Sequence, residues 1–161
     1  MKNYTRGFTL IELLVVITLI GIMSAIVMVA LTSAKNSSED TSLQATMNKL
    51  QTQAELYYSN FSNYGGNASA YSSVCPTSAV ASTTAGMMGV SGSGLLAFTT
   101  AIVEQVGSTN TLCTVSTNGV KWAVAARLKG DTTKVVCVDG TGRSVISITT
   151  LASAITDSVC N

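Results

Sequence analysis

The chain has 161 residues and a formal net charge of +1, enough for one modest domain plus an extended element. Only 11% of its residues are charged while 47% are hydrophobic, and it contains no histidine. The missing histidine excludes Ser-His-Asp and Cys-His catalytic centres, and without a C-x-x-C pair it argues against a zinc site. No run of Lys or Arg occurs, so a nucleic-acid partner is not indicated. Nothing in the composition indicates an enzyme or a cofactor.

Residues 1–7 form a short basic stretch, and the following 24 residues, Phe8–Leu31, contain Glu12 as their one ionisable side chain. At ~1.5 Å per residue this run makes a helix of roughly 36 Å, enough to cross a ~30 Å hydrocarbon core. The basic stretch predicts a cytoplasmic N-terminus and an outward-facing chain after Leu31. An ordinary cleaved signal is disfavoured, because the run is too long, carries a carboxylate and has no clear small-x-small site at its end.

The sequence beyond the apolar run predicts that the same helix continues. No proline occurs before Pro76 and no glycine lies between Gly21 and Gly65. Apolar residues recur in steps of four and three, which is the stripe of an amphipathic helix. We therefore predict one helix from Phe8 to Phe61, apolar all round at first and then one-sided, ended by Gly65-Gly66. The stripe consists of Leu43, Met47, Leu50, Ala54, Tyr57 and Phe61.

The rest of the chain predicts a small α/β domain. Residues 62–94, rich in Ser, Thr, Gly and Ala, are expected to form a loop, and residues 95–106 a short second helix. From Leu112 the period changes to two, and turn signals at Asn118-Gly119, 129–131 and 139–142 separate the strands. The fold class is therefore α+β: a long N-terminal helix packed on an antiparallel sheet of three or four strands.

All four cysteines follow the apolar run, in the part expected outside the cytoplasm, which favours two disulfides over four buried thiols. Three connectivities are possible. We favour Cys75–Cys113, which would close the loop and second helix, and Cys137–Cys160, which would hold the C-terminal tail against the sheet. The aspartates near the turns are too scattered for a calcium loop, so no metal is expected.

The segment Gly7-Phe8-Thr9-Leu10-Ile11-Glu12 and the apolar residues after it resemble the N-terminal signature of type IV pilins and the related pseudopilins of type II secretion. The family pattern is a glycine, an apolar first mature residue and a glutamate at the fifth mature position, here Gly7, Phe8 and Glu12. One departure is Val29, where many pilins have a proline, so no kink is expected there. A lone carboxylate is costly in such a helix, which makes the motif specific.

The resemblance implies that a prepilin peptidase cuts between Gly7 and Phe8 and methylates the new amine of Phe8. The chain is then the substrate of that peptidase. The positive amine would lie four residues before Glu12, so the carboxylate of one subunit could pair with the amine of its neighbour inside an apolar bundle. Leaving either charge alone there is costly, and this would fix the register of assembly.

These expectations divide the chain into a leader (1–7), a transmembrane and assembly helix (8–31) and a periplasmic or extracellular domain (32–161). The resemblance implies a pilus subunit, single-pass in the inner membrane before it enters an extracellular pilus. Its expected partners are identical or homologous subunits, the prepilin peptidase, the inner-membrane assembly platform and membrane lipid. Two alternatives stay open: a pseudopilin of a type II secretion or competence system, in a periplasmic pseudopilus, and an uncleaved, single-pass anchored binding protein.

Overall fold

The computed structural model describes residues 7–65, 71–79 and 86–161, and the chain divides into two compact units after Asn36. Helix α1 (Leu10–Phe61) contributes residues to both units. All other elements belong to the second unit: β1 (Tyr71–Ser73), the 3-10 helix η1 (Gly86–Met88), α3 (Leu95–Val106), the 3-10 helix η2 (Ser108–Asn110), β2 (Thr111–Val115), β3 (Trp122–Arg127), β4 (Lys134–Asp139), β5 (Ser144–Ile148), α4 (Leu151–Ala154), β6 (Ile155–Thr156) and β7 (Val159–Cys160).

The predicted long helix is confirmed, but the residue that ends it differs from the prediction. Ser62 adopts a left-handed conformation with φ 56°, and its N–H donates to the carbonyl of Tyr58 at 2.7 Å. This left-handed residue stops the helix at Phe61, the predicted last residue, in place of the expected Gly65-Gly66 signal. The helix begins at Leu10, two residues after the predicted Phe8. Gly66 itself lies outside the described residues.

The second half of α1 buries the predicted stripe. The four buried residues of the helix are Leu43, Met47, Leu50 and Ala54. Tyr57 is half-buried against the same core, whereas Phe61 at the helix end is 59% exposed. The stripe is therefore buried over about three helical turns, and its last residue at the helix end is exposed.

The sheet is a five-stranded antiparallel meander in the order β1-β2-β3-β4-β5. The sequence predicted three or four strands, and β1 is the additional one: it lies in the segment expected to be a loop and pairs with β2, Ser73 opposite Cys113. Strands β2 to β5 follow the predicted turns. Gly119, in the β2–β3 connection, has φ 65°, which a glycine adopts without strain.

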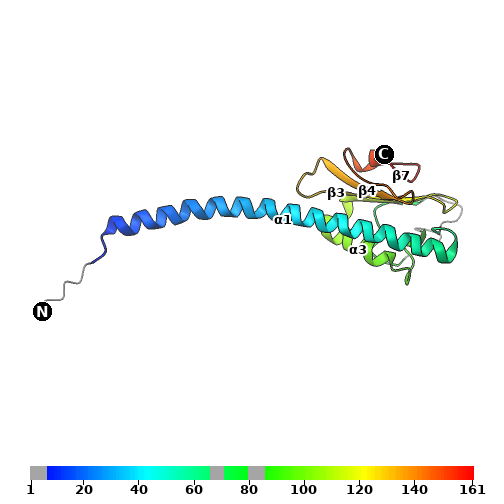
Figure 1. The fold of residues 1–161 in the computed structure, drawn as a ribbon, viewed down its shortest axis with the longest axis horizontal. Coiled ribbons are helices and arrows are strands. Elements are labelled where there is room, and N and C mark those ends of the chain that lie inside the picture. The colour runs from blue at the N-terminus through cyan, green and yellow to red at the C-terminus, as the bar shows by residue number, and fades with distance from the viewer. Residues whose placement is uncertain (1–6, 66–70, 80–85) are drawn as a thin grey trace. The chain divides into compact units, whose positions relative to one another are not determined.

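Two layers cover the two faces of the sheet (Figure 1). The second half of α1, together with α3, packs on one face, with Trp122 fully buried between them. The other face carries Ala123, Ala125 and Val135, which pack against α4 and the β6–β7 hairpin. Strand β3 is therefore buried from Trp122 to Ala126 and is covered on both faces.

Polar contacts attach α1 to the sheet layer at both ends of the buried stripe. The Asp40 carboxylate accepts the N–H groups of Lys129 (2.7 Å) and Gly130 (3.0 Å) in the β3–β4 turn. Farther along the helix, the Gln51 amide donates to the carbonyl of Asp139 at 2.8 Å. These bonds give backbone groups of the two turns hydrogen-bond partners on the helix.

Two disulfides are present, Cys75–Cys113 and Cys137–Cys160, and these are the pairs favoured by the sequence analysis. Cys75 and Cys113 lie in the core that contains α1. Cys137 and Cys160 lie in the core on the other face of the sheet. Each face thus has its own crosslink.

Replacing Met47 by alanine tests the packing of the stripe. Met47 is fully buried, so Met47→Ala should lower the free energy of unfolding by about 2–5 kcal/mol. The measurement is urea unfolding of the full chain in detergent micelles, followed by the fluorescence of Trp122, the single tryptophan. The exposed neighbour Lys49→Ala is the control and should change stability by no more than about 0.5 kcal/mol. Equal effects of the two substitutions would contradict this packing.

Candidate functional site

Gly7, Phe8 and Thr9, which come directly before α1, are open to solvent. Gly7, Phe8 and Thr9 lie outside regular secondary structure, and the Phe8 side chain is 86% exposed. A Cβ added to Gly7 would meet no atom within 4 Å. The chain itself thus has room for a side chain at position 7, and the peptide bond between Gly7 and Phe8 is accessible.

Thr9 and Glu12 form a capping box at the start of α1. The Thr9 hydroxyl accepts the N–H of Glu12 at 3.3 Å. In return, Glu12 Oε2 accepts the backbone N–H of Thr9 at 2.9 Å and its hydroxyl at 2.7 Å. These reciprocal bonds satisfy donors that the first helical turn leaves unpaired. They fix the start of the helix and hold the Glu12 carboxylate against its own first turn.

The helix surface from Leu10 to Leu31 is apolar and uncovered. Its large side chains are 47% to 82% exposed, the extremes being Val15 and Leu10. The hydroxyls of Thr18 and Ser24 donate to helix carbonyls at 2.9 and 2.8 Å, so they add no unsatisfied donor to this surface. By length and composition, α1 is the one described helix able to cross a membrane. Such a surface requires lipid or another protein to cover it.

The predicted site residues fall into two groups. Gly7, Phe8 and Glu12 lie together, in the extended segment and first turn of the first unit. The four cysteines belong to the second unit. Thr9 was missed by the sequence analysis, although a threonine three residues before a glutamate, ahead of an apolar run, is a capping-box signature.

Comparisons with known proteins agree with this N-terminal arrangement. Residues 2–32 match the family model of the prokaryotic N-terminal methylation motif. The type IV wide pilus major component PilA4 of Thermus thermophilus is 37% identical over 70 residues, which cover 44% of this chain and 53% of that protein. Together these two matches support a type IV pilin family assignment. This is a family of structural subunits and not of enzymes.

The match to the relative is partial. The chain spans about half the length of PilA4 in the alignment, and no solved structure matches it significantly. The long apolar helix packed through its second half on an antiparallel sheet is nevertheless consistent with the pilin fold.

Removing the Thr9 hydroxyl tests the capping box. Thr9→Val keeps the shape of the side chain but loses both side-chain bonds to Glu12, so the first turn should fray. We expect amide hydrogen exchange at residues 9–12 to become at least threefold faster in detergent micelles. Thr18→Val is the matched control, because that hydroxyl donates to the Val15 carbonyl inside the helix. Unchanged exchange in Thr9→Val would show that the box does not hold the turn.

Proposed function

We propose that the chain is the precursor of a type IV pilus subunit, cut between Gly7 and Phe8 and polymerised through residues 8–31. The observation that carries this proposal is an apolar helix surface, uncovered over its whole length and holding a single carboxylate in its first turn. The match of residues 2–32 to the methylation motif supports the same proposal.

The cleavage step is supported by the open backbone at the start of the chain. The Gly7–Phe8 bond precedes the helix, and among the described residues no atom lies within 4 Å of a Cβ added at Gly7. Because the chain itself leaves room for a larger residue at position 7, a need for glycine would come from the peptidase active site. There an extended, uncrowded backbone would be required. Methylation of the new Phe8 amine would follow.

Before assembly, residues 8–31 would hold the subunit in the inner membrane, with Lys2 and Arg6 on the cytoplasmic side and the α/β domain outside. The leader takes both positive charges with it, leaving seven Lys and Arg residues against eight Asp and Glu residues. The assembly platform would then extract the subunit. On leaving lipid, the apolar surface would be covered by the same helices of other pilin subunits.

Glu12 is suited to pair with a neighbouring subunit while it caps its own helix. Both bonds from Thr9 reach one oxygen, Oε2. Within the described part of the chain, Oε1 accepts no hydrogen bond. Capping and pairing therefore do not compete for the same atom. In an apolar bundle the free oxygen would meet the Phe8 amine of the next subunit, and the low dielectric would strengthen that bond.

Between the pilin and pseudopilin functions, the relative favours the pilin, because PilA4 is described as the major component of a type IV wide pilus. The third alternative, an anchored binding protein, differs from the pilin and the pseudopilin in that its N-terminus would stay uncleaved.

N-terminal mass spectrometry of the protein from its own cells tests the cleavage. We expect a chain that begins at Phe8 with one added methyl group on its amine. The matched variant Gly7→Val should accumulate at full precursor length, because a branched residue crowds the scissile bond. A natural protein that still carries residues 1–7 would overturn the assembly proposal and favour the anchored binding protein.

Two substitutions at Glu12 separate charge pairing from helix capping. Glu12→Gln keeps an oxygen for the Thr9 N–H but has no charge, whereas Glu12→Ala loses both. If pairing with the Phe8 amine is required, both variants should insert into the membrane and yield at least tenfold less sheared filament. Thr18→Val is the control and should assemble normally. A normal filament yield from Glu12→Gln would eliminate the charge pair and leave capping as the role of Glu12.

A further inference from the structure

The last eleven residues, 151–161, form a C-terminal strap on the sheet face opposite α1. The strap consists of α4 and the β6–β7 hairpin, and its apolar residues Ala154, Ile155 and Cys160 pack against Ala125 and Cys137 of the sheet. Thr150 caps α4 with a capping box to Ser153. The Asn161 amide donates to the Ser153 carbonyl at 2.6 Å and to the Thr156 hydroxyl at 2.7 Å. The strap thus has its own internal bonds.

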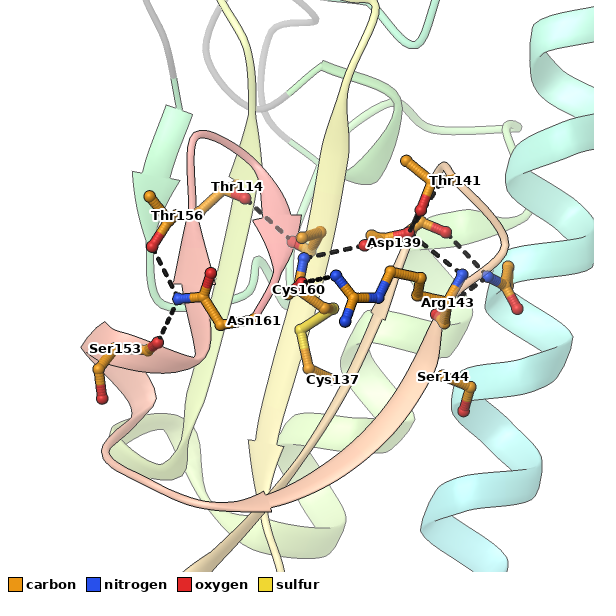
Figure 2. Close-up of a disulfide and its surroundings, with 12 residues drawn as sticks. Thr114, Cys137, Asp139, Thr141, Arg143, Ser144, Ser153, Thr156, Cys160 and Asn161 are labelled. Atoms are coloured by element: carbon orange, nitrogen blue, oxygen red, sulfur yellow. Dashed lines mark hydrogen bonds between the residues drawn. A yellow bond between two sulfur atoms is a disulfide. The ribbon is translucent and has the colours of Figure 1, made fainter.

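Asp139, at the end of β4, joins this strap to the sheet with one carboxylate oxygen. Asp139 is fully buried, and its Oδ2 accepts the backbone N–H of Cys160 at 2.8 Å. Its Oδ1 accepts the N–H and hydroxyl of Thr141 at 2.8 and 2.6 Å, and the N–H of Arg143 at 3.3 Å. One oxygen therefore shapes the β4–β5 turn while the other holds the strap (Figure 2).

The environment keeps the Asp139 carboxylate charged. Burial by itself would raise its pKa, but the Thr141 hydroxyl and the N–H groups of Cys160, Thr141 and Arg143 outweigh burial and lower the pKa below its usual range. A charged acceptor makes stronger hydrogen bonds than a neutral one.

Arg143 binds the carbonyl of Cys160, the residue whose N–H is bound by Asp139. Its Nη1 donates to the carbonyl of Cys160 at 2.7 Å, so both backbone groups of Cys160 are bound by side chains of one turn (Figure 2). The Cα atoms of Cys137 and Cys160 are 5.8 Å apart, within bridging distance. None of these hydrogen bonds involves a sulfur atom.

We propose that Asp139 and Arg143 are positioning residues for the Cys137–Cys160 disulfide: they dock the strap on the sheet before the sulfurs are joined. The oxidant is a disulfide of the thiol-oxidase or glutathione class. One thiolate attacks it, and the second resolves the mixed disulfide. Two electrons pass to the oxidant, and the two thiol protons end on its two released sulfurs. This inference does not depend on cleavage or filament assembly.

Docking also explains how Cys160 is kept from the other two cysteines. Cys113 is in register with Val124, whereas Cys137 is in register with Ala125, the next residue along β3. Successive residues of a strand face opposite sides, so Cys113 and Cys137 point to different faces of the sheet. A strap docked by Asp139 delivers Cys160 to the face that carries Cys137.

The alternative is that Asp139 only shapes its turn, and the chain contains a matched control for this. Asp131 makes the same turn contacts, because its Oδ1 accepts the N–H of Thr133 at 3.1 Å and the Thr133 hydroxyl. Asp131 lies in the β3–β4 connection, makes an ion pair with Lys134 at 3.1 Å, and is half-exposed. If Asp139 acts only by shaping its turn, Asp131→Asn should affect disulfide formation as much as Asp139→Asn does.

The test is refolding of the reduced full chain in detergent micelles with defined ratios of oxidised and reduced glutathione. Alkylation and peptide mapping then give the amount of each disulfide at equilibrium. Asp139→Asn and Arg143→Met should each lower the effective concentration of the Cys137–Cys160 pair by about tenfold or more, because each loses a charged hydrogen bond to Cys160. The Cys75–Cys113 pair should change by less than about twofold, and Asp131→Asn should alter neither pair. Equal loss of both disulfides in Asp139→Asn would show that Asp139 only stabilises the whole domain, and this would overturn the proposal.

Hydrogen exchange in a chain that lacks Cys137 and Cys160 is a second test, independent of how well the Asp139 and Arg143 variants refold. The doubly substituted chain Cys137→Ala, Cys160→Ala cannot form the disulfide, but the backbone N–H of residue 160 should still be bound by Asp139. We expect hydrogen exchange of that amide to be at least tenfold slower than exchange of the amide of residue 158 in the exposed hairpin turn. Adding Arg143→Met should remove most of the protection. An unprotected amide at residue 160 in the doubly substituted chain would show that the disulfide docks the strap, contrary to the proposal.

Discussion

The constraint on which this structure depends is that α1 is one helix with two kinds of surface. From Leu43 to Ala54 its apolar stripe is buried by α3 and the sheet, so the second unit covers it within the same chain. From Leu10 to Leu31 every side chain is exposed, and the described part of the chain offers nothing to cover them. The hydrophobic effect acts on both surfaces, but the described residues bury only the surface in the second half of the helix.

The second unit, by contrast, completes its own packing on both faces of the sheet. Strand β3 is buried from Trp122 to Ala126 because α1 and α3 cover one face and the C-terminal strap covers the other. Each core contains one disulfide, so the two layers are crosslinked separately. A domain whose folding draws on its own residues leaves the N-terminal helix free to exchange lipid for other subunits, as the proposed function requires.

Features with a strong period could be predicted from the sequence, and features held by distant partners could not. The stripe of α1, the helix at 95–106 and the turns around β3 to β5 follow from local spacing. Strand β1 has three residues in a Ser-rich segment and exists through its pairing with β2. The Thr9–Glu12 capping box could have been predicted from its three-residue spacing. The bond from Asp139 to Cys160 could not, because 21 residues separate its partners.

Glu12 and Asp139 each use one carboxylate oxygen for a local hydrogen bond and leave the other for a second partner. Each gives one oxygen to its own local backbone, Glu12 to the start of α1 and Asp139 to the β4–β5 turn. For Asp139 the second oxygen binds a segment that arrives from elsewhere in the chain, the strap. For Glu12 the corresponding segment would be the Phe8 amine of another subunit. A carboxylate already oriented by local bonds loses less conformational freedom when its second partner binds, which favours one register over others. Under the two proposals, the same arrangement would select a disulfide partner within the chain and a neighbouring subunit in a filament.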